Sequence, residues 1–123
     1  MRGLPFFIKI MKTEEYDTVK RYYSNKNINI VELDCNSVKS KYEIFKVFSE
    51  ALKFPEYFGN NWDAFNDCIT DLSWLGNKNC VVLIKNIKNV KDKQLIVTLI
   101  ELLDHAHDFW TKHNETFDIH VFQ

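Results

Sequence analysis

The residues of this chain best suited to chemistry are four carboxylates that share a segment without a single basic residue. Residues 54–77 contain no Lys, Arg or His. The acids of this segment are Glu56, Asp63, Asp67 and Asp71. Because the whole chain has a formal net charge of only −1, they form a local concentration of negative charge. Such a cluster can attract a cationic partner, or it can supply the general acid and base of a hydrolytic reaction.

A turn followed by a helix is predicted to carry these acids. Pro55 is expected to end the preceding helix, and Gly59 provides a position where the chain can turn with a positive φ. Asn61 is a good N-cap, so the helix should begin near Trp62. The apolar side of that helix comprises Trp62, Phe65, Ile69 and Leu72. The polar side comprises Asp63, Asn66, Asp67, Thr70 and Asp71.

Two interpretations of the acidic side are open. Most charged helix faces are simply solvated. A helix selected only for stability would interleave lysines, because Asp67 and Asp71 lie past the first turn, where the helix dipole no longer favours acids. Carboxylates four residues apart also repel each other by about 0.2–0.5 kcal/mol per pair. The spacing therefore suits a solvated face and an anionic surface for a cationic partner about equally.

The same segment resembles the signature of the barstar family, the intracellular inhibitors of barnase-type ribonucleases. The resemblance combines fixed spacing with uncommon residue types and contains no gap. The matching residues are Pro55, Glu56, Tyr57, Phe58, Gly59, Asn61, Asp63, Ala64, Phe65, Asp67, Cys68, Ile69 and Thr70. The departures are Phe58 where Tyr is commoner, Trp62 where Leu is usual, Asn66 where the prototype of the family has Trp, and Asp71 where a Gly follows the Thr. They allow a different individual target within the same class.

The resemblance implies a non-enzymatic inhibitor that forms a one-to-one complex with a cationic, barnase-like ribonuclease and protects the cell that makes the toxin. The turn and helix would occlude the nuclease active site, with Asp63 and Asp67 standing where RNA phosphates otherwise lie. In the family a further acid on the last helix contacts the nuclease, which here points to Asp104 and Asp108. The expected partner-binding residues are Tyr57, Phe58, Gly59, Asn61, Asp63, Asn66, Asp67, Thr70, Asp71, Asp104 and Asp108.

Other functions rest on fewer residues. Asp63 and Asp67 could form the acid and base of a phosphodiesterase, although the sequence supplies no cationic or metal group beside them. His105 and His107 are two residues apart and so point to different sides of a helix, which argues against a metal site. The sequence also shows no motif for a cofactor. An interaction module for a partner that is not a nuclease is the third hypothesis.

The composition predicts a single cytoplasmic domain. A chain of 123 residues suits one domain, and 16 basic against 17 acidic residues give no reason to expect direct binding of nucleic acid. Cys35, Cys68 and Cys80 are widely spaced and odd in number, which favours reduced thiols over a disulfide framework. The apolar run at 5–11 is too short to span a membrane. We therefore expect neither export nor a membrane anchor.

The alternation of strands and helices predicts an α/β fold, which the resemblance makes barstar-like, with a small three-stranded parallel sheet packed against helices. The expected strands, in the order one, two, three, are 28–33, 80–84 and 117–122. Ser40 and Glu43 form a capping box for a helix that ends before Pro55, and a long helix is expected at 92–112. Residues 1–26 would be an N-terminal extension, with a short strand at 6–11 and a helix at 13–24, before a barstar-like domain at 27–123.

Overall fold

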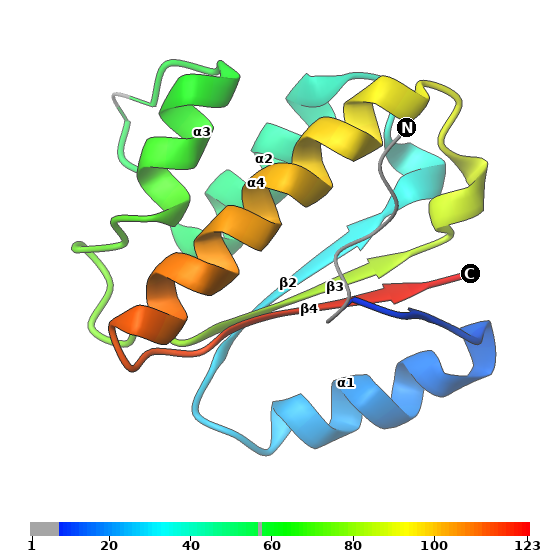
Figure 1. Cartoon of the computed structure of the whole chain (residues 1–123), viewed down its shortest axis with the longest axis horizontal. Helices are drawn as coiled ribbons and strands as arrows, with labels where there is room; N and C mark the ends of the chain where they lie inside the picture. The colour runs from blue at the N-terminus through cyan, green and yellow to red at the C-terminus, as the bar shows by residue number, and fades with distance from the viewer. Residues whose placement is uncertain (1–7, 57) are drawn as a thin grey trace.

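A computed structural model describes residues 8–56 and 58–123 and shows the predicted α/β architecture. Its strands are β1 (Ile10–Met11), β2 (Asn29–Asp34), β3 (Cys80–Lys85) and β4 (Phe117–Phe122). They form one parallel sheet in the order β1–β4–β3–β2. Helices α2 (Lys41–Leu52), α3 (Trp62–Ile69) and α4 (Lys93–Lys112) cover one face, and α1 (Tyr16–Ser24) lies against the other (Figure 1). Short 3-10 helices occupy η1 (Thr13–Glu15), η2 (Cys35–Ser37) and η3 (Ile87–Asn89).

The sheet has four strands rather than the predicted three. The additional strand is β1, whose Ile10 and Met11 pair in parallel with Val121 and Phe122 at the edge of the sheet. Beyond them, the Gln123 N–H donates to the Met11 carbonyl at 3.0 Å. A short strand was expected at 6–11, but its pairing with β4 joins opposite ends of the chain, and no local pattern in the sequence predicts such a contact. The strand expected at 6–11 is shortened accordingly, and residues 6 and 7 lie outside the described part of the chain. The other three strands keep the predicted order.

The central strand β3 is buried on both faces, as its continuous apolar run predicts. Cys80, Val82 and Ile84 belong to the main core beneath α2, α3 and α4. Val81 and Leu83 point to the other side, into a smaller core that α1 covers. All five side chains have no exposed surface. The sheet therefore separates two hydrophobic cores.

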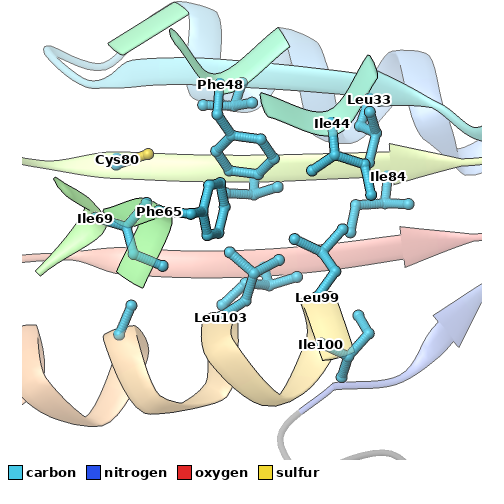
Figure 2. Packing of buried hydrophobic residues seen from close by; sticks show 14 of the residues in the cluster. Leu33, Ile44, Phe48, Phe65, Ile69, Cys80, Ile84, Leu99, Ile100 and Leu103 are labelled. Atoms are coloured by element: carbon cyan, nitrogen blue, oxygen red, sulfur yellow. The ribbon is translucent and has the colours of Figure 1, made fainter. Parts of the chain in front are cut away.

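The main core fixes α3 against the sheet. Phe65 and Ile69 of α3 lie between Phe48 of α2 and Leu103 of α4 (Figure 2). The rings of Phe48 and Phe65 meet edge to face, with 5.0 Å between their centroids. This geometry is favourable and leaves no exposed surface on either ring, so it holds the apolar side of α3 in the core. The opposite side of α3 is left at the molecular surface.

The helices begin where the sequence predicts. The Ser40 hydroxyl accepts a hydrogen bond from the Tyr42 N–H at 3.3 Å, and the Glu43 carboxylate accepts one from the Ser40 N–H at 2.5 Å. These bonds form the expected capping box of α2. At the start of α4, the Asp92 carboxylate accepts the Leu95 N–H at 3.2 Å. Each cap satisfies N–H groups that a helix leaves unpaired at its first turn.

The N-terminal part of the described chain is joined to the sheet by packing and by hydrogen bonds. The helix predicted at 13–24 begins as η1 and continues as α1. The Tyr16 hydroxyl donates to the Glu32 carboxylate at 2.5 Å, and the Lys20 ammonium lies 3.1 Å from the same carboxylate. At the other end of α1, the Tyr23 hydroxyl is 2.7 Å from His120 Nε2. The proposed division into an extension and a domain at residue 27 stays a prediction.

Two further features bear on the expected compartment. Cys35, Cys68 and Cys80 are all buried free thiols, in agreement with the sequence. Among the helices that the structure describes, none combines the length and the apolar character needed to cross a membrane. The cytoplasmic location remains a prediction.

Candidate protein-binding surface

The loop that leads into α3 starts with a sharp change of direction at Lys53. This residue has φ 53° and ends α2, and the N–H of the next residue, Phe54, bonds back to the Ser49 carbonyl at 3.0 Å. A turn follows, in which the Phe58 N–H donates to the Pro55 carbonyl at 3.0 Å. Tyr57, one of the predicted binding residues, lies outside the described part of the chain. The helix before Pro55 thus ends at Leu52, as expected.

Close to the start of α3, the residue with a positive φ is Asn60 rather than Gly59. Asn60 has φ 54°, and neither of the glycines that the structure describes has a positive φ. The prediction for Gly59 was therefore wrong, because asparagine also tolerates the left-handed region. Gly59 instead lies close to the start of α3, where an added Cβ would stand 3.3 Å from Asn61 Nδ2. A side chain at Gly59 would press on the amide group of Asn61, which caps the helix.

Asn61 is the N-cap of α3, as the sequence predicts. Its Oδ1 accepts a hydrogen bond from the Ala64 N–H at 2.8 Å, and the helix begins at Trp62. The cap fixes the first turn, which contains Asp63. Because this side chain already serves the helix, Asn61 offers a partner mainly the remaining capacity of its amide group.

Aromatic packing holds the loop and the helix together. Phe45 of α2 contacts Phe58 and Trp62, with centroid separations of 5.5 and 5.0 Å, both edge to face. Phe54 also packs edge to face on Phe58, at 5.1 Å. Phe58 and Trp62 are only partly buried, so each supports the loop from below and still reaches the surface. For Phe58, this packing explains why a phenyl ring without a hydroxyl fits here.

The acidic side of α3 faces solvent. Asp63 and Asp67 are both exposed and lie four residues apart, which places them on the same side of the helix. Glu56, in the preceding loop, is exposed as well. Within residues 8–56 and 58–123, no ion pair joins these carboxylates to a basic side chain. The negative charge is therefore available to a partner, and we call Glu56, Asp63, Asp67 and Asp71 the acidic surface.

Asp71 belongs to this surface but not to the helix, contrary to the prediction. The helix ends at Ile69, and Thr70 is its C-cap. Leu72 then takes φ 53° and turns its side chain into the core, where it has no exposed surface. The Ile69 carbonyl accepts a 2.7 Å hydrogen bond from the Trp110 indole, in place of the backbone N–H that a longer helix would supply. Asp71 is exposed just beyond the helix end.

Cys68 lies within reach of the acidic surface. Burial raises the pKa of its thiol, and the charges of Asp67 and Asp71 raise it further. The thiol therefore stays protonated at neutral pH and adds no charge of its own.

Two further predicted residues interact mainly with each other. The Thr70 hydroxyl donates to the Asn66 backbone carbonyl at 2.7 Å, and the Thr70 N–H bonds to the same oxygen at 3.2 Å. Both residues are partly exposed. The Asn66 side-chain oxygen is buried without a hydrogen-bond partner in the described chain.

The acids predicted on the last helix lie on α4, the helix that packs beside α3 (Figure 1). Asp108 is exposed, whereas Asp104 is half-buried. Their spacing of four residues places them on one side of α4. They therefore stay candidates for an extension of the acidic surface.

The sequence did not reveal how strongly two tryptophans support this surface. The Trp110 indole holds the end of α3 through Ile69, and the Trp74 indole donates to the Leu52 carbonyl at the end of α2, at 2.9 Å. A buried tryptophan generally needs an acceptor for its N–H, and that is the signal that could have suggested such contacts. Among the described residues, no group of three or more His, Cys, Asp or Glu side chains is arranged to hold a metal ion.

Comparison with known proteins identifies a family for this chain. The model of the family described as Barstar (barnase inhibitor) matches residues 28–122. No curated protein matches the chain. The matched range includes α3, the loop before it and every member of the acidic surface.

Proposed function

Because the chain belongs to the barstar family, we propose that it inhibits a barnase-like ribonuclease by covering the active site of that enzyme with the acidic surface. The observation that carries this proposal is the arrangement of Asp63 and Asp67. They are exposed side by side on a short helix whose other side is fixed in the core. A nuclease cleft that binds RNA is lined with cations. Two fixed carboxylates can occupy the positions that the RNA phosphates take in this cleft.

The acidic surface suits such a cleft for a second reason. Its carboxylates have no competing cation among the described residues, so binding does not first require an internal ion pair to break. The helix and its cap are also preformed, because Asn61 caps the first turn and Phe65 is fully buried. A preformed surface loses little conformational entropy when it binds. Tyr57, Phe58, Gly59, Asn61, Asn66, Thr70, Asp104 and Asp108 would complete the contact area around the carboxylates.

The proposal includes a cellular role. An inhibitor of this kind would protect the cell that makes the toxic nuclease and would act in the cytoplasm. The three free thiols suit a reducing compartment. Inhibition requires no cofactor and no catalytic residue, since an occluded cleft admits no substrate.

The test is an activity titration. Increasing amounts of the chain are added to a barnase-like ribonuclease, and RNA cleavage is followed together with complex formation. We expect activity to fall linearly to zero at one equivalent. A panel of such nucleases is needed, because the departures at Phe58, Trp62, Asn66 and Asp71 allow a different cognate enzyme. If no nuclease of the panel binds, and the chain itself hydrolyses RNA with added Mg²⁺ or Mn²⁺, the inhibitor hypothesis is wrong and the phosphodiesterase hypothesis replaces it.

A further inference from the structure

A polar pocket lies on the side of the sheet opposite to α3. It is lined by the C-terminal end of α1 and by residues at the beginnings of β2, β3 and β4, and its volume is about 370 Å³. The lining residues that matter here are Tyr22, Tyr23, Lys26, Asn27, Ile28 and Asp118. This volume falls in the range of about 300–1,000 Å³ that is usual for small-molecule sites. The pocket shares no residue with the acidic surface.

The pocket contains one cation and one anion that do not neutralise each other through an ion pair in the described chain. The Lys26 ammonium lies 4.8 Å from the centroid of the Tyr22 ring. On the other side, Asp118 accepts only a long hydrogen bond from the Tyr23 hydroxyl, at 3.4 Å. His107 Nδ1 lies 3.9 Å from Asp118 Oδ1, which is within ion-pair distance but too long for a hydrogen bond, and it bonds to the Phe117 carbonyl at 2.8 Å.

The neighbouring histidine does not cancel the carboxylate. Burial lowers the pKa of His120, against the opposing effect of Asp118, so its ring is neutral at neutral pH. Its Nε2 is engaged with the Tyr23 hydroxyl at 2.7 Å. The pocket therefore offers one ammonium, from Lys26, and one carboxylate, from Asp118. Its walls combine the rings of Tyr22 and Tyr23 and the side chain of Ile28 with the polar side chains of Asn27, Asn79 and Thr116. A strongly charged ligand finds no net complement there.

We propose that this pocket binds a small zwitterion, namely a free α-amino acid with an apolar side chain. The ligand ammonium would contact Asp118, and the ligand carboxylate would contact Lys26. The side chain would pack against Tyr22, Tyr23 and Ile28. The pocket lies at the C-terminal end of α1, where the helix dipole favours a cation and so supports the ammonium position. Recognition at two charged points separates an amino acid from a simple amine or acid.

The experiment uses NMR titration of the full-length chain with three related probes. L-phenylalanine carries both charges, phenethylamine lacks the carboxylate, and 3-phenylpropionate lacks the ammonium. We expect saturable shifts of the amide signals of the pocket residues with L-phenylalanine. Each incomplete probe should bind at least about tenfold more weakly, because a charge-assisted hydrogen bond is lost.

Two variants test which pocket residue contacts each charge of the ligand. Lys26→Gln should weaken the binding of L-phenylalanine and leave that of phenethylamine unchanged, whereas Asp118→Asn should weaken both. Lys91→Gln, an exposed lysine outside the pocket lining, is the matched control. Because Lys26 is exposed, Lys26→Gln should fold normally. The test can therefore be read from this variant alone if Asp118→Asn does not fold. The proposal is overturned if neither L-phenylalanine nor L-leucine shifts the pocket signals, or if all three probes bind equally well.

Discussion

The indole nitrogen of Trp110 donates a 2.7 Å hydrogen bond to the carbonyl oxygen of Ile69, and this contact is fully buried. It joins α4 to the last residue of α3, 41 positions earlier in the chain. The bond satisfies a carbonyl that the end of the helix leaves without an intrahelical partner. It therefore holds the end of α3 in place and, with it, the direction of the acidic surface.

Trp110→Phe should destabilise the fold through this bond. The substitution keeps an aromatic ring but leaves the Ile69 carbonyl buried and unpaired, which costs about 1–3 kcal/mol. Urea unfolding should show a lower midpoint with an unchanged slope. Trp74→Phe is the matched control, because its indole donates to the Leu52 carbonyl at a partly exposed position and should cost less. Equal losses in both variants would contradict the special role of the buried bond.

Asp67→Ala should weaken the complex with the cognate ribonuclease strongly. Truncating one partner of a buried charge pair costs about 2–5 kcal/mol, a range whose reference case is itself the barnase–barstar complex, so it is taken over and not calculated from this chain. Asp63→Ala should cost less, because the N–H groups of the first turn of α3 already offset part of its charge. Glu14→Ala, in η1 on the other side of the sheet, is the control. Isothermal titration would refute the phosphate-mimic role if both aspartate variants stay within about 0.5 kcal/mol of the wild type.

Local signals in the sequence were sufficient for α3 and its cap. Asn61 precedes a segment whose apolar residues recur every three or four positions, as on one side of a helix. Both the cap and the helix start are determined by contacts within four residues. The segment that forms the acidic surface could therefore be predicted before any long-range contact was known. The same holds for the capping box of Ser40 and Glu43.

The features that could not be predicted from the sequence depend on contacts between distant segments. The end of α3 is set by Trp110 and by the burial of Leu72, so the periodic pattern alone carried the helix too far, to Asp71. The strand β1 exists because its two residues find the free edge of β4. In the loop, Gly59 and Asn60 can both adopt a positive φ, and in the structure it is Asn60 that does so.

Lys53→Gly should stabilise the chain. Lys53 is exposed and has φ 53°, a conformation in which a side chain is strained and glycine is not. We expect a gain of about 0.5–1 kcal/mol, measured from the urea midpoint. The same substitution at the exposed residue Lys46, inside α2, should instead cost about 1 kcal/mol, because glycine is a poor helix former. Changes of the same sign at both positions would contradict the assigned backbone conformation.

His120 should make the stability of the fold depend on pH. Burial lowers the pKa of His120 in the folded state, although Asp118 acts in the opposite direction. Above the unfolded pKa of about 6.5 its contribution is fully present, and it is lost as the pH falls below that value towards the folded pKa, because the unfolded chain then binds the proton more readily. His120→Gln should flatten the fall in unfolding free energy over this window. His105→Gln, at an exposed position of α4, controls for the loss of one histidine, and identical slopes in both variants would contradict the role of His120.

Removal of residues 1–25 should uncover the second core while leaving the acidic surface in place. Val81, Leu83 and Phe122 have no exposed surface, and they pack in the small core together with Tyr16 of α1. Exposing a fully buried Val, Leu or Phe side chain costs about 1.5–3 kcal/mol, so the truncated chain should unfold at a much lower urea concentration and bind a hydrophobic dye. Because α3 packs on the other face, truncated chain that stays folded should still bind the nuclease. An unchanged urea midpoint without dye binding would show that the β1–α1 unit is dispensable, and it would favour treating these residues as a separate extension. If the truncated chain folds but no longer binds the nuclease, the result would instead show that binding through the acidic surface depends on α1.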